Sequence, residues 1–354
     1  MEEIIRFALI GCGAIAHKHV CALNRIPNTK IVGVYDNDSD VAKSFSQRYS
    51  IPCFPDAESM ISKTDPMVLN ILTPSGYHCR DILSLVKFKK HFIVEKPLAL
   101  NLNETDRALN KCNELGLKIF VVKQNRFNPP IKKLKEALDK NRFGKPVLGT
   151  VRVRWSRDQA YYDQRPWRGT CELDGGIFAN QASHHIDLLV WMMGAVDNVI
   201  ASTATRLMNI ETEDTGGALI EFTSGALGII EITTATRPKD LEGSISILGE
   251  NGSVEVGGFF VNKLKTWNFD KPHPMDDDIW EKYSSVPDEL AWNHTELFKN
   301  IVKSLRQGTS GLIEGNEARK AVELIDAIYQ SAKKRERIYL NHSGAEILVD
   351  NPLK

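Results

Sequence analysis

A glycine pattern near the amino terminus has the residue types that bind a dinucleotide. The pattern GxGxxA occupies residues 11–16, between an apolar run and a helical run. Gly11 permits a tight turn, and Gly13 lets the backbone approach a pyrophosphate. The first N–H groups of the helix, at Ala14 and Ile15, would then face the anion. Glycine turns also occur in other α/β proteins, so the pattern alone decides little.

Asp36 adds context to this turn. It ends the second predicted strand, 36 − 11 = 25 residues after the first glycine. A carboxylate there can accept hydrogen bonds from an adenosine ribose and would repel a ribose phosphate. The next residues are Asn37 and Asp38 rather than arginine, which favours NAD over NADP. The alternative is that Asp36 only caps a helix that begins near Ser39.

Glu95 and Lys96 follow another predicted strand, and Pro97 comes next. Ligands bind open α/β sheets at the carboxyl ends of the strands, so Lys96 would lie in a binding cleft. A free lysine has a pKa near ~10.4, and burial beside a positively charged nicotinamide would lower it toward that of a useful base. The alternative is a solvated lysine at a strand end.

His184 lies on a helix predicted over residues 177–193. Helical spacing places it on one face with Asn180 and Asp187, whereas His185 points about 100° away. His184 is therefore the better candidate to relay a proton or to hold a hydroxyl. We predict a structural role for His185, and the alternative for both histidines is a satisfied interior position.

An arginine-rich and aromatic stretch spans residues 152–168. Arginine forks match phosphate and carboxylate geometry, and aromatic faces can stack on a base. For Arg152 and Arg154, which share one strand face, a solvated sheet face is an equal alternative. The stretch contains Arg152, Arg154, Arg157, Arg165 and Arg168, with Trp155, Tyr161, Tyr162 and Trp167 between them.

The elements around these residues form two patterns. In the first third, short β-rich runs alternate with helical runs, which predicts a parallel sheet covered on both faces, a doubly wound Rossmann-type α/β domain over residues 1–122. The predicted strands are Ile5–Ile10, Lys30–Tyr35, Met67–Leu72, His91–Val94 and Lys118–Val122. The predicted helices lie near Ala16–Arg25, Asp40–Arg48, Ala57–Lys63, Tyr77–Leu85 and Asn103–Leu115.

Residues 123–354 predict an α+β domain with a large, open, mainly antiparallel sheet, because strands follow one another through turn sequences at 223–225 and 250–252. The predicted strands are Val147–Trp155, Val199–Arg206, Thr215–Phe222, Ala226–Thr234 and Gly243–Leu248. The predicted helices are Pro130–Leu138, Ile177–Met193, Glu289–Arg306 and Asn316–Lys333.

The composition excludes several classes of protein. The 354 residues carry 45 Lys plus Arg and 45 Asp plus Glu, so no global charge draws the chain to nucleic acid or to a membrane. Six scattered cysteines without a CxxC pair fit reduced thiols, and neither a signal peptide nor a spanning segment is visible, which predicts a cytoplasmic protein. No metal site is expected: the pair His17 and His19 fits an exposed helix surface, and residues 276–278, three aspartates, fit a solvated run.

The segment His91–Pro97, together with the glycine pattern, resembles the Gfo/Idh/MocA family of sugar and cyclitol dehydrogenases. The resemblance covers essentially the whole chain. Residues 73–78 resemble the family's segment beside the nicotinamide, and residues 174–187 resemble its substrate helix. A narrower similarity, to the WlbA/WbpB branch, lies in residues 122–126, 161–163, 167–170, 180–184, 213–216 and 241–244.

The branch implies a specific activity. Its members oxidise the 3-hydroxyl of UDP-N-acetylglucosaminuronic acid with NAD, on the way to sugars of bacterial O-antigen lipopolysaccharide. In several of them 2-oxoglutarate reoxidises the NADH on the enzyme. The family also implies dimers or tetramers formed through the second domain's sheet. Rival functions are oxidation of another sugar or a cyclitol, and a non-catalytic NAD-binding regulator.

These arguments together give an expected site. Lys96 and His184 are the catalytic pair. The expected cofactor contacts are Gly11, Gly13, Ala14, Ile15, Asp36, Thr73, Pro74, His78, Glu95, Lys96, Gln124, Trp167 and Arg168. The expected substrate contacts are Lys96, Arg154, Arg157, Tyr161, Asn180 and His184.

Asn180 departs from the broad family, which carries aspartate at the position four residues before the histidine. An amide can orient a hydroxyl but cannot take up a proton at neutral pH. An acid–base relay of three members therefore does not carry over to this chain, and at most Lys96 and His184 remain. The NAD-linked nucleotide-sugar branch shares this asparagine.

Overall fold

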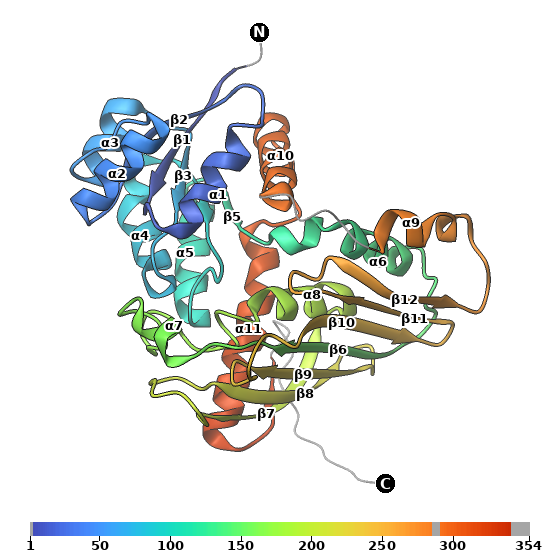
Figure 1. Ribbon diagram of the computed structural model, residues 1–354. Coiled ribbons are helices and arrows are strands. Elements are labelled where there is room, and N and C mark those ends of the chain that lie inside the picture. Colours follow the sequence, from blue (N-terminus) through green and yellow to red (C-terminus); the bar gives the residue numbers. More distant parts are fainter. Residues whose placement is uncertain (1–2, 285–290, 341–354) are drawn as a thin grey trace.

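The computed structural model describes residues 3–284 and 291–340, and these residues form two domains around two separate sheets (Figure 1). The first sheet is parallel, with the order β2-β1-β3-β4-β5. Its strands are β1 (Ile5–Ile10), β2 (Thr29–Tyr35), β3 (Val68–Ile71), β4 (His91–Val94) and β5 (Ile119–Val121). The Rossmann prediction is confirmed, because the strands are nearly continuous apolar runs with helices on both faces.

The helices of the first domain follow the predicted ones within about two residues. They are α1 (Ala14–Leu23), α2 (Ser39–Tyr49), α3 (Ala57–Thr64), α4 (His78–Leu85) and α5 (Leu102–Glu114). Short 3₁₀ turns occupy Ser75–Tyr77, Val86–Phe88 and Gln124–Phe127. Asp38, Asp56 and Asn101 accept backbone N–H groups at the starts of α2, α3 and α5, which stabilises those ends.

The second sheet has the order β12-β11-β10-β6-β9-β8-β7-β13. All its pairs are antiparallel except β6 with β9, which confirms the mainly antiparallel prediction. Its strands are β6 (Pro146–Arg154), β7 (Val196–Ala204), β8 (Thr215–Phe222), β9 (Leu227–Thr233), β10 (Glu242–Gly249), β11 (Gly252–Gly257), β12 (Lys263–Phe269) and β13 (Ile338–Tyr339). The sequence prediction missed β11, β12 and β13.

The remaining helices are α6 (Pro129–Asp139), α7 (Gln159–Asp163), α8 (Ser183–Met193), α9 (Ile279–Tyr283), α10 (Trp292–Gln307) and α11 (Gly315–Lys334), with a 3₁₀ turn at Pro274–Asp276. Helix α8 packs on the inner face of the sheet, where Ile186 and Leu189 join Val151 and Val153 in one apolar core. The predicted helix over 177–193 begins only at Ser183, because residues before it form turns. Residues 289 and 290 of the predicted Glu289–Arg306 helix lie outside the described residues.

Helix α10 returns to the first domain although it follows the second in sequence (Figure 1). Leu297, Phe298 and Ile301 belong to the apolar core that covers one face of the parallel sheet. The ring of Phe298 meets that of Phe7 edge-on, with 6.5 Å between centroids. The domain division at residue 123 remains a prediction, and the first domain also draws on this later segment.

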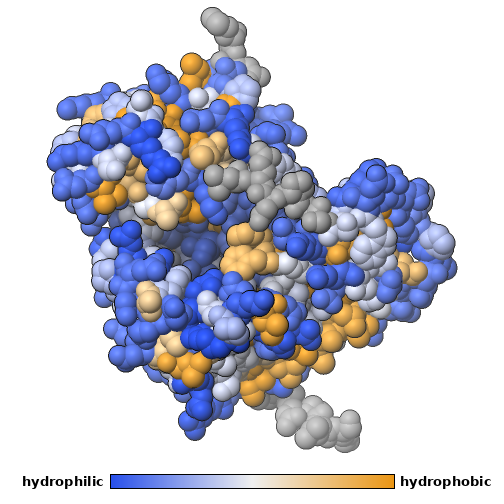
Figure 2. All heavy atoms as spheres, viewed as in Figure 1, coloured by the Kyte–Doolittle hydropathy of each residue, from blue (hydrophilic) through white to orange (hydrophobic). Residues whose placement is uncertain are grey.

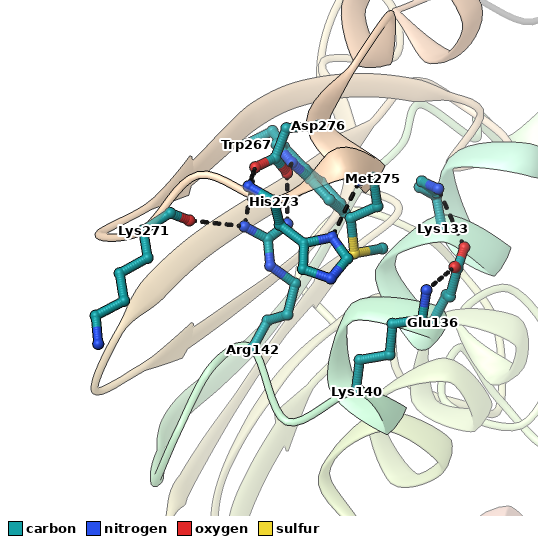
Figure 3. Close-up of polar contacts among 9 residues, drawn as sticks. All are labelled: Lys133, Glu136, Lys140, Arg142, Trp267, Lys271, His273, Met275 and Asp276. Carbon is teal, nitrogen blue, oxygen red and sulfur yellow. Dashed lines mark hydrogen bonds and ion pairs between the residues drawn. The ribbon is translucent and has the colours of Figure 1, made fainter.

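Asp276 is held in a polar cluster at the far end of the second sheet (Figure 3). Its carboxylate accepts hydrogen bonds from the Arg142 guanidinium, from Trp267 Nε1 at 2.6 Å and from His273 N at 2.9 Å. Arg142 also lies over the ring of Phe269, 3.9 Å from its centroid. The interpretation of this aspartate as merely solvated was therefore wrong; it anchors the loop after β12.

No helix in the described part of the chain is both long and apolar enough to cross a bilayer.

Candidate active site

The glycine turn has the backbone that a bound pyrophosphate needs. Gly11 has φ +102°, and a Cβ there would lie 2.7 Å from the carbonyl oxygen of Leu72, so only glycine fits. No atom lies within 4 Å of where a Cβ on Gly13 would stand, so that backbone is open to approach. Among the described residues no side chain caps α1 at Gly13, which leaves its first N–H groups available to an anion.

Asp36 is tied to this turn rather than to the following helix. Its Oδ2 accepts a hydrogen bond from Cys12 N at 2.7 Å, and its Oδ1 accepts one from Asp38 N at 3.0 Å. The cap of α2 is Asp38, which accepts from Asp40 N and Val41 N. The alternative role of Asp36 as a helix cap is therefore wrong. Its carboxylate lies beside the glycine turn, where an adenosine ribose would be bound.

Lys96 projects from the end of β4 toward the second domain. Its Nζ donates to both the backbone oxygen and Oδ1 of Asn180, each at 2.8 Å. Burial lowers the pKa of Lys96 to about 8, although the negative charges of Glu95 and Asp174 oppose this shift. A lysine with this pKa is partly neutral near pH 8 and can accept a proton.

His184 lies at the start of α8, and Gln124 Nε2 is 3.0 Å from its Nε2. Burial, followed by the charges of Lys96 and Lys123, lowers the pKa of His184 well below its usual value. The imidazole is therefore neutral at physiological pH. Its Nδ1 is buried and has no hydrogen-bond partner among the described residues, as is true of Gln124 Oε1 and of both amide atoms of Gln181. Buried polar atoms without partners mark a place where a ligand can satisfy them.

The structure places Asn180 on the turn before α8, not on the helix face that the sequence predicted. Asn180 contacts Lys96 directly, whereas Asp187 pairs with Arg126 at 2.8 Å through both carboxylate oxygens and lies 3.6 Å from Lys123 Nζ. Sequence reasoning gave Lys123 and Arg126 no role. Their positive charges keep the buried Asp187 ionised, and the charge of Lys123 also lowers the pKa of the neighbouring His184.

His19 is a further residue that sequence reasoning misplaced. Its exposed fraction is 0%, so the interpretation as an exposed helix surface was wrong. Its Nε2 lies 2.9 Å from Glu95 Oε1, and its Nδ1 accepts from the Asn70 amide at 3.0 Å. A usable signal existed, because His19 falls in a helical stripe with the apolar residues Ala16, Val20 and Leu23.

Thr73 and Pro74 lie at the end of β3, where the second domain touches the first. Gly76 N donates to Leu173 O at 3.1 Å, and a Cβ on Gly76 would collide with Glu172 O. His78 is buried, with Nε2 2.8 Å from Thr73 O and Nδ1 2.7 Å from Pro97 O. His78 therefore holds the Thr73 loop and the Lys96–Pro97 segment together; its contact with a cofactor stays a prediction.

Arginine and aromatic side chains gather on the turn that follows β6. The Arg168 guanidinium lies 4.1 Å from the ring centroid of Tyr161 and donates to Tyr161 O at 2.7 Å. Arg157 lies 5.3 Å from the ring centroids of both Trp155 and Tyr161. Trp155 in turn meets His185, with 5.8 Å between ring centroids. The turn thus extends from the histidine pair as a cationic, aromatic surface, and Trp167 lies on it.

Arg154 is the one expected substrate contact that the structure turns away from this cluster. It alternates with the inward-facing Val153, and its Nε and Nη2 donate to the carboxylate of Glu231, at 2.6 and 2.8 Å, on the outer sheet face. Glu242 is 3.2 Å away. The alternative interpretation, in which Arg152 and Arg154 lie on a solvated sheet face, therefore agrees with the structure. We no longer expect Arg154 to contact the substrate.

Figure 2 shows a recess lined by hydrophilic residues between the two domains. Hydrogen bonds across the domain junction join Lys96 to Asn180 and Gln124 to His184. Within residues 3–284 and 291–340, no group of three or more His, Cys, Asp or Glu side chains could hold a metal ion. The cluster offers instead a lysine that can lose its proton and a neutral imidazole, beside a dinucleotide-type turn. This set suits proton removal from a hydroxyl coupled to hydride transfer.

Comparison with known families matches almost the whole chain. Residues 5–123 match the GFO_IDH_MocA family, described as the oxidoreductase family with an NAD-binding Rossmann fold. Residues 135–340 match the C-terminal α/β domain of the same oxidoreductase family.

Two solved structures are similar over nearly their full length. The WlbA dehydrogenase of Chromobacterium violaceum, in complex with NADH and UDP-GlcNAcA, is 38% identical, with TM-score 0.91 and coverage of 97% of this chain and 98% of that one. The WlbA dehydrogenase of Bordetella pertussis, with the same two ligands, is also 38% identical, with TM-score 0.93 and coverage of 96% and 99%.

A curated relative, the myo-inositol 2-dehydrogenase of Thermotoga maritima, is 23% identical over 95% of this chain and 98% of its own length.

Proposed function

The chain belongs to the Gfo/Idh/MocA family of NAD-dependent sugar oxidoreductases, and within it we propose that this protein oxidises the 3-hydroxyl of UDP-N-acetylglucosaminuronic acid to the 3-keto product. One observation carries the substrate: two WlbA dehydrogenases, each in complex with NADH and UDP-GlcNAcA, are 38% identical over at least 96% of the chain. The myo-inositol dehydrogenase reaches only 23%. The pathway, O-antigen lipopolysaccharide synthesis in the cytoplasm, is part of the proposal.

The residues expected to hold NAD come from four segments, which follow β1, β2, β3 and β5. The backbone N–H groups at Ala14 and Ile15 would face the pyrophosphate, and Asp36 would accept from the adenosine ribose. His78 holds the Thr73–Pro74 loop beside the Lys96–Pro97 segment, and Gln124 contacts His184. When bound, NAD supplies the acceptor for the hydride that leaves the sugar carbon.

Lys96 and His184 divide the proton chemistry. Lys96, in its neutral form, would take the proton of the 3-hydroxyl as the sugar carbon is oxidised to the ketone. The lysine then carries a positive charge, which Glu95 and Asp174 stabilise. The neutral His184 holds the sugar oxygen with one ring nitrogen, and Gln124 fixes the orientation of the ring. Asn180 holds the amine in place.

The charged groups of the substrate match the turn after β6. Arg157 and Arg168 present guanidinium groups beside Tyr161 and Trp155, which suits a diphosphate or a uronate together with a base. Arg157 also forms an ion pair with Asp240 at 3.2 Å, which partly neutralises its charge. Arg168 is the stronger candidate for an anion.

The direct test incubates purified protein with NAD and one sugar at a time and follows the absorbance of NADH. Turnover with UDP-N-acetylglucosaminuronic acid, and at least roughly tenfold less with UDP-N-acetylglucosamine, which lacks the carboxylate, is the expected result. Turnover with myo-inositol alone would replace the proposal with a cyclitol dehydrogenase, the function of a curated relative. Tight NAD binding without turnover of any sugar would favour a regulator.

Two further expectations belong to this proposal. The enzyme carrying NADH would be reoxidised by 2-oxoglutarate, which the loss of NADH absorbance in a single turnover would show. The protein would also form a dimer or tetramer, because the outer sheet face carries the exposed row Ile200, Leu219 and Ile229 on paired strands. An exposed apolar row of this kind is typical of a face that meets another subunit.

A further inference from the structure

Asp174 is a buried carboxylate that is hydrogen-bonded to Asn180, the residue that Lys96 contacts. Only 1% of its surface is exposed. Its Oδ1 accepts from the Asn180 side-chain amide, and its Oδ2 accepts from Gly169 N at 2.8 Å. Each oxygen of the carboxylate therefore has its own partner, on two different turns.

The Asn180 amide could in principle face Lys96 with either end, because its oxygen and nitrogen are nearly equal in shape. An ionised carboxylate only accepts hydrogen bonds, so Asp174 must be met by the amide nitrogen. The amide oxygen of Asn180, Oδ1, is then free to accept a hydrogen bond from Lys96 Nζ, at 2.8 Å. The orientation of the amide, and with it the place of the amine, is decided by Asp174.

The second partner connects this arrangement to the cationic turn. Gly169 has φ +71° and follows Arg168 directly, so the hydrogen bond from Gly169 N to Asp174 ties down the peptide that carries Arg168. Asp174 thus links the amine at the end of β4 with the turn that presents the arginine.

We propose that Asp174 is a positioning residue for Lys96: it fixes the Asn180 amide so that its oxygen holds the amine in the cleft, and it anchors the turn that carries Arg168. The inference rests on the proposed role of Lys96 as the base. Asp174 supplies the carboxylate that Asn180 lacks, and it acts on Lys96 through the Asn180 amide rather than by direct contact.

Charge gives this role a measurable sign. Lys96 is faced by Glu95 from its own strand end, by Asp174 from the turn before α8, by Lys123 from the end of β5 and by His184 from α8. Asp174 raises the pKa of Lys96, against the burial that lowers it. Removing the carboxylate must therefore lower the pKa of Lys96 further, and it frees the amide to turn its nitrogen toward the amine, which acts in the same direction.

The experiment uses Asp174→Asn and the matched control Asp163→Asn, which removes the same charge from the nearby exposed end of α7. The pKa of Lys96 is measured in full-length protein without ligand, from the pH dependence of its labelling by acetic anhydride, read by peptide mass spectrometry. Asp174→Asn should shift the midpoint to lower pH, and Asp163→Asn should leave it in place. This readout needs no substrate, so it remains decisive if the proposed sugar is wrong.

Turnover provides a second arm. In Asp174→Asn, kcat should fall by roughly tenfold or more, because the amine is no longer held in one place. Asn180→Asp puts two carboxylates in contact, so that one must take up a proton, and it should be strongly impaired. Adding Asp174→Asn to Asn180→Asp should recover at least roughly tenfold of that loss, since the like charges no longer meet.

An unmoved Lys96 midpoint in Asp174→Asn overturns the inference, even if the variant is less stable. So does a double variant that is no better than Asn180→Asp alone. A merely structural aspartate would lower the melting temperature, and its replacement would not restore the turnover of Asn180→Asp.

Discussion

His19 Nε2 lies 2.9 Å from Glu95 Oε1, so the helix that follows the glycine turn is joined directly to the strand end that carries Lys96. Burial raises the pKa of Glu95, but the hydrogen bond from His19 and the positive charge of Lys96 are among the effects that outweigh it and hold that pKa below its usual value. Glu95 therefore stays ionised inside the protein. The buried pair of His19 and Glu95 thus connects the helix after the glycine turn with the segment that carries Lys96.

His19→Ala should lower the free energy of unfolding by about 1–3 kcal/mol, because it leaves a buried carboxylate without its main partner. His19→Gln, which keeps a donor, should lose less. Urea unfolding followed by circular dichroism measures both variants. Equal stability of His19→Ala and the unaltered protein would show that Glu95 does not depend on this contact.

Lys96→Met should reduce turnover by roughly 100-fold to 10,000-fold, the range for loss of a general base, while NAD binding persists. Lys43→Met, at an exposed position on α2, is the matched control and should have full activity. NADH absorbance gives the rates and calorimetry the NAD affinity. Near-normal turnover in Lys96→Met would remove this lysine from the mechanism.

The pH dependence of kcat/KM follows from the pKa of Lys96, which is about 8. The base must be neutral, so kcat/KM should rise about tenfold per pH unit below that value and level off above it. His184, whose pKa is well below its usual value, stays neutral over the same range and adds no second limb. Initial rates between pH 6 and pH 10 test this, and a rate that falls across pH 8 would contradict it.

Asp36→Asn should weaken the preference for NAD over NADP by roughly tenfold or more, because the charge that repels a ribose phosphate is lost. The amide can still accept the hydrogen bond from Cys12 N that the carboxylate accepts at 2.7 Å, so the turn itself should remain folded. The ratio of kcat/KM for the two cofactors is the measurement. An unchanged ratio would assign the preference to other residues.

The double variant Leu219→Lys/Ile229→Lys should dissociate the protein into monomers. These residues are 41% and 40% exposed, and they pair across β8 and β9 on the outer sheet face. Charges placed there would have to be buried in any sheet-to-sheet contact. Sedimentation velocity distinguishes the outcomes, with Leu207→Lys, an exposed residue outside the strands, as the control. A double variant that keeps the original sedimentation coefficient would exclude this face.

The first domain could be predicted from local sequence because each of its strands is a short apolar run bounded by a helix. β1 and β4 have the predicted bounds, Ile5–Ile10 and His91–Val94. The second domain was harder. β11 has only Val254 and Val256 turned inward, and glycines at both ends weaken its strand signal, although the turn at 250–252 already required a strand after it.

Sequence reasoning could name single residues of the candidate site but not the contacts between them. Lys96 and His184 lie at the junction of the domains, but the partner of Asn180 could not be found, because Asp174 reaches it through a turn that sequence periodicity assigned to the helix start. The surroundings of Arg154 could not be predicted for a related reason. Its partners, Glu231 and Glu242, sit on neighbouring strands, and only the cross-strand register brings them together.

The return of α10 has a consequence for how the chain reaches this structure. During synthesis the first 123 residues leave the ribosome long before residues 292–307 are made. The contacts of Phe7 and His19 with the ring of Phe298 can therefore form only late in synthesis. A gene fragment cut at residue 123 would express a sheet with part of one apolar face open to water. The apolar core on that face of the sheet is complete only when almost the whole chain has been translated.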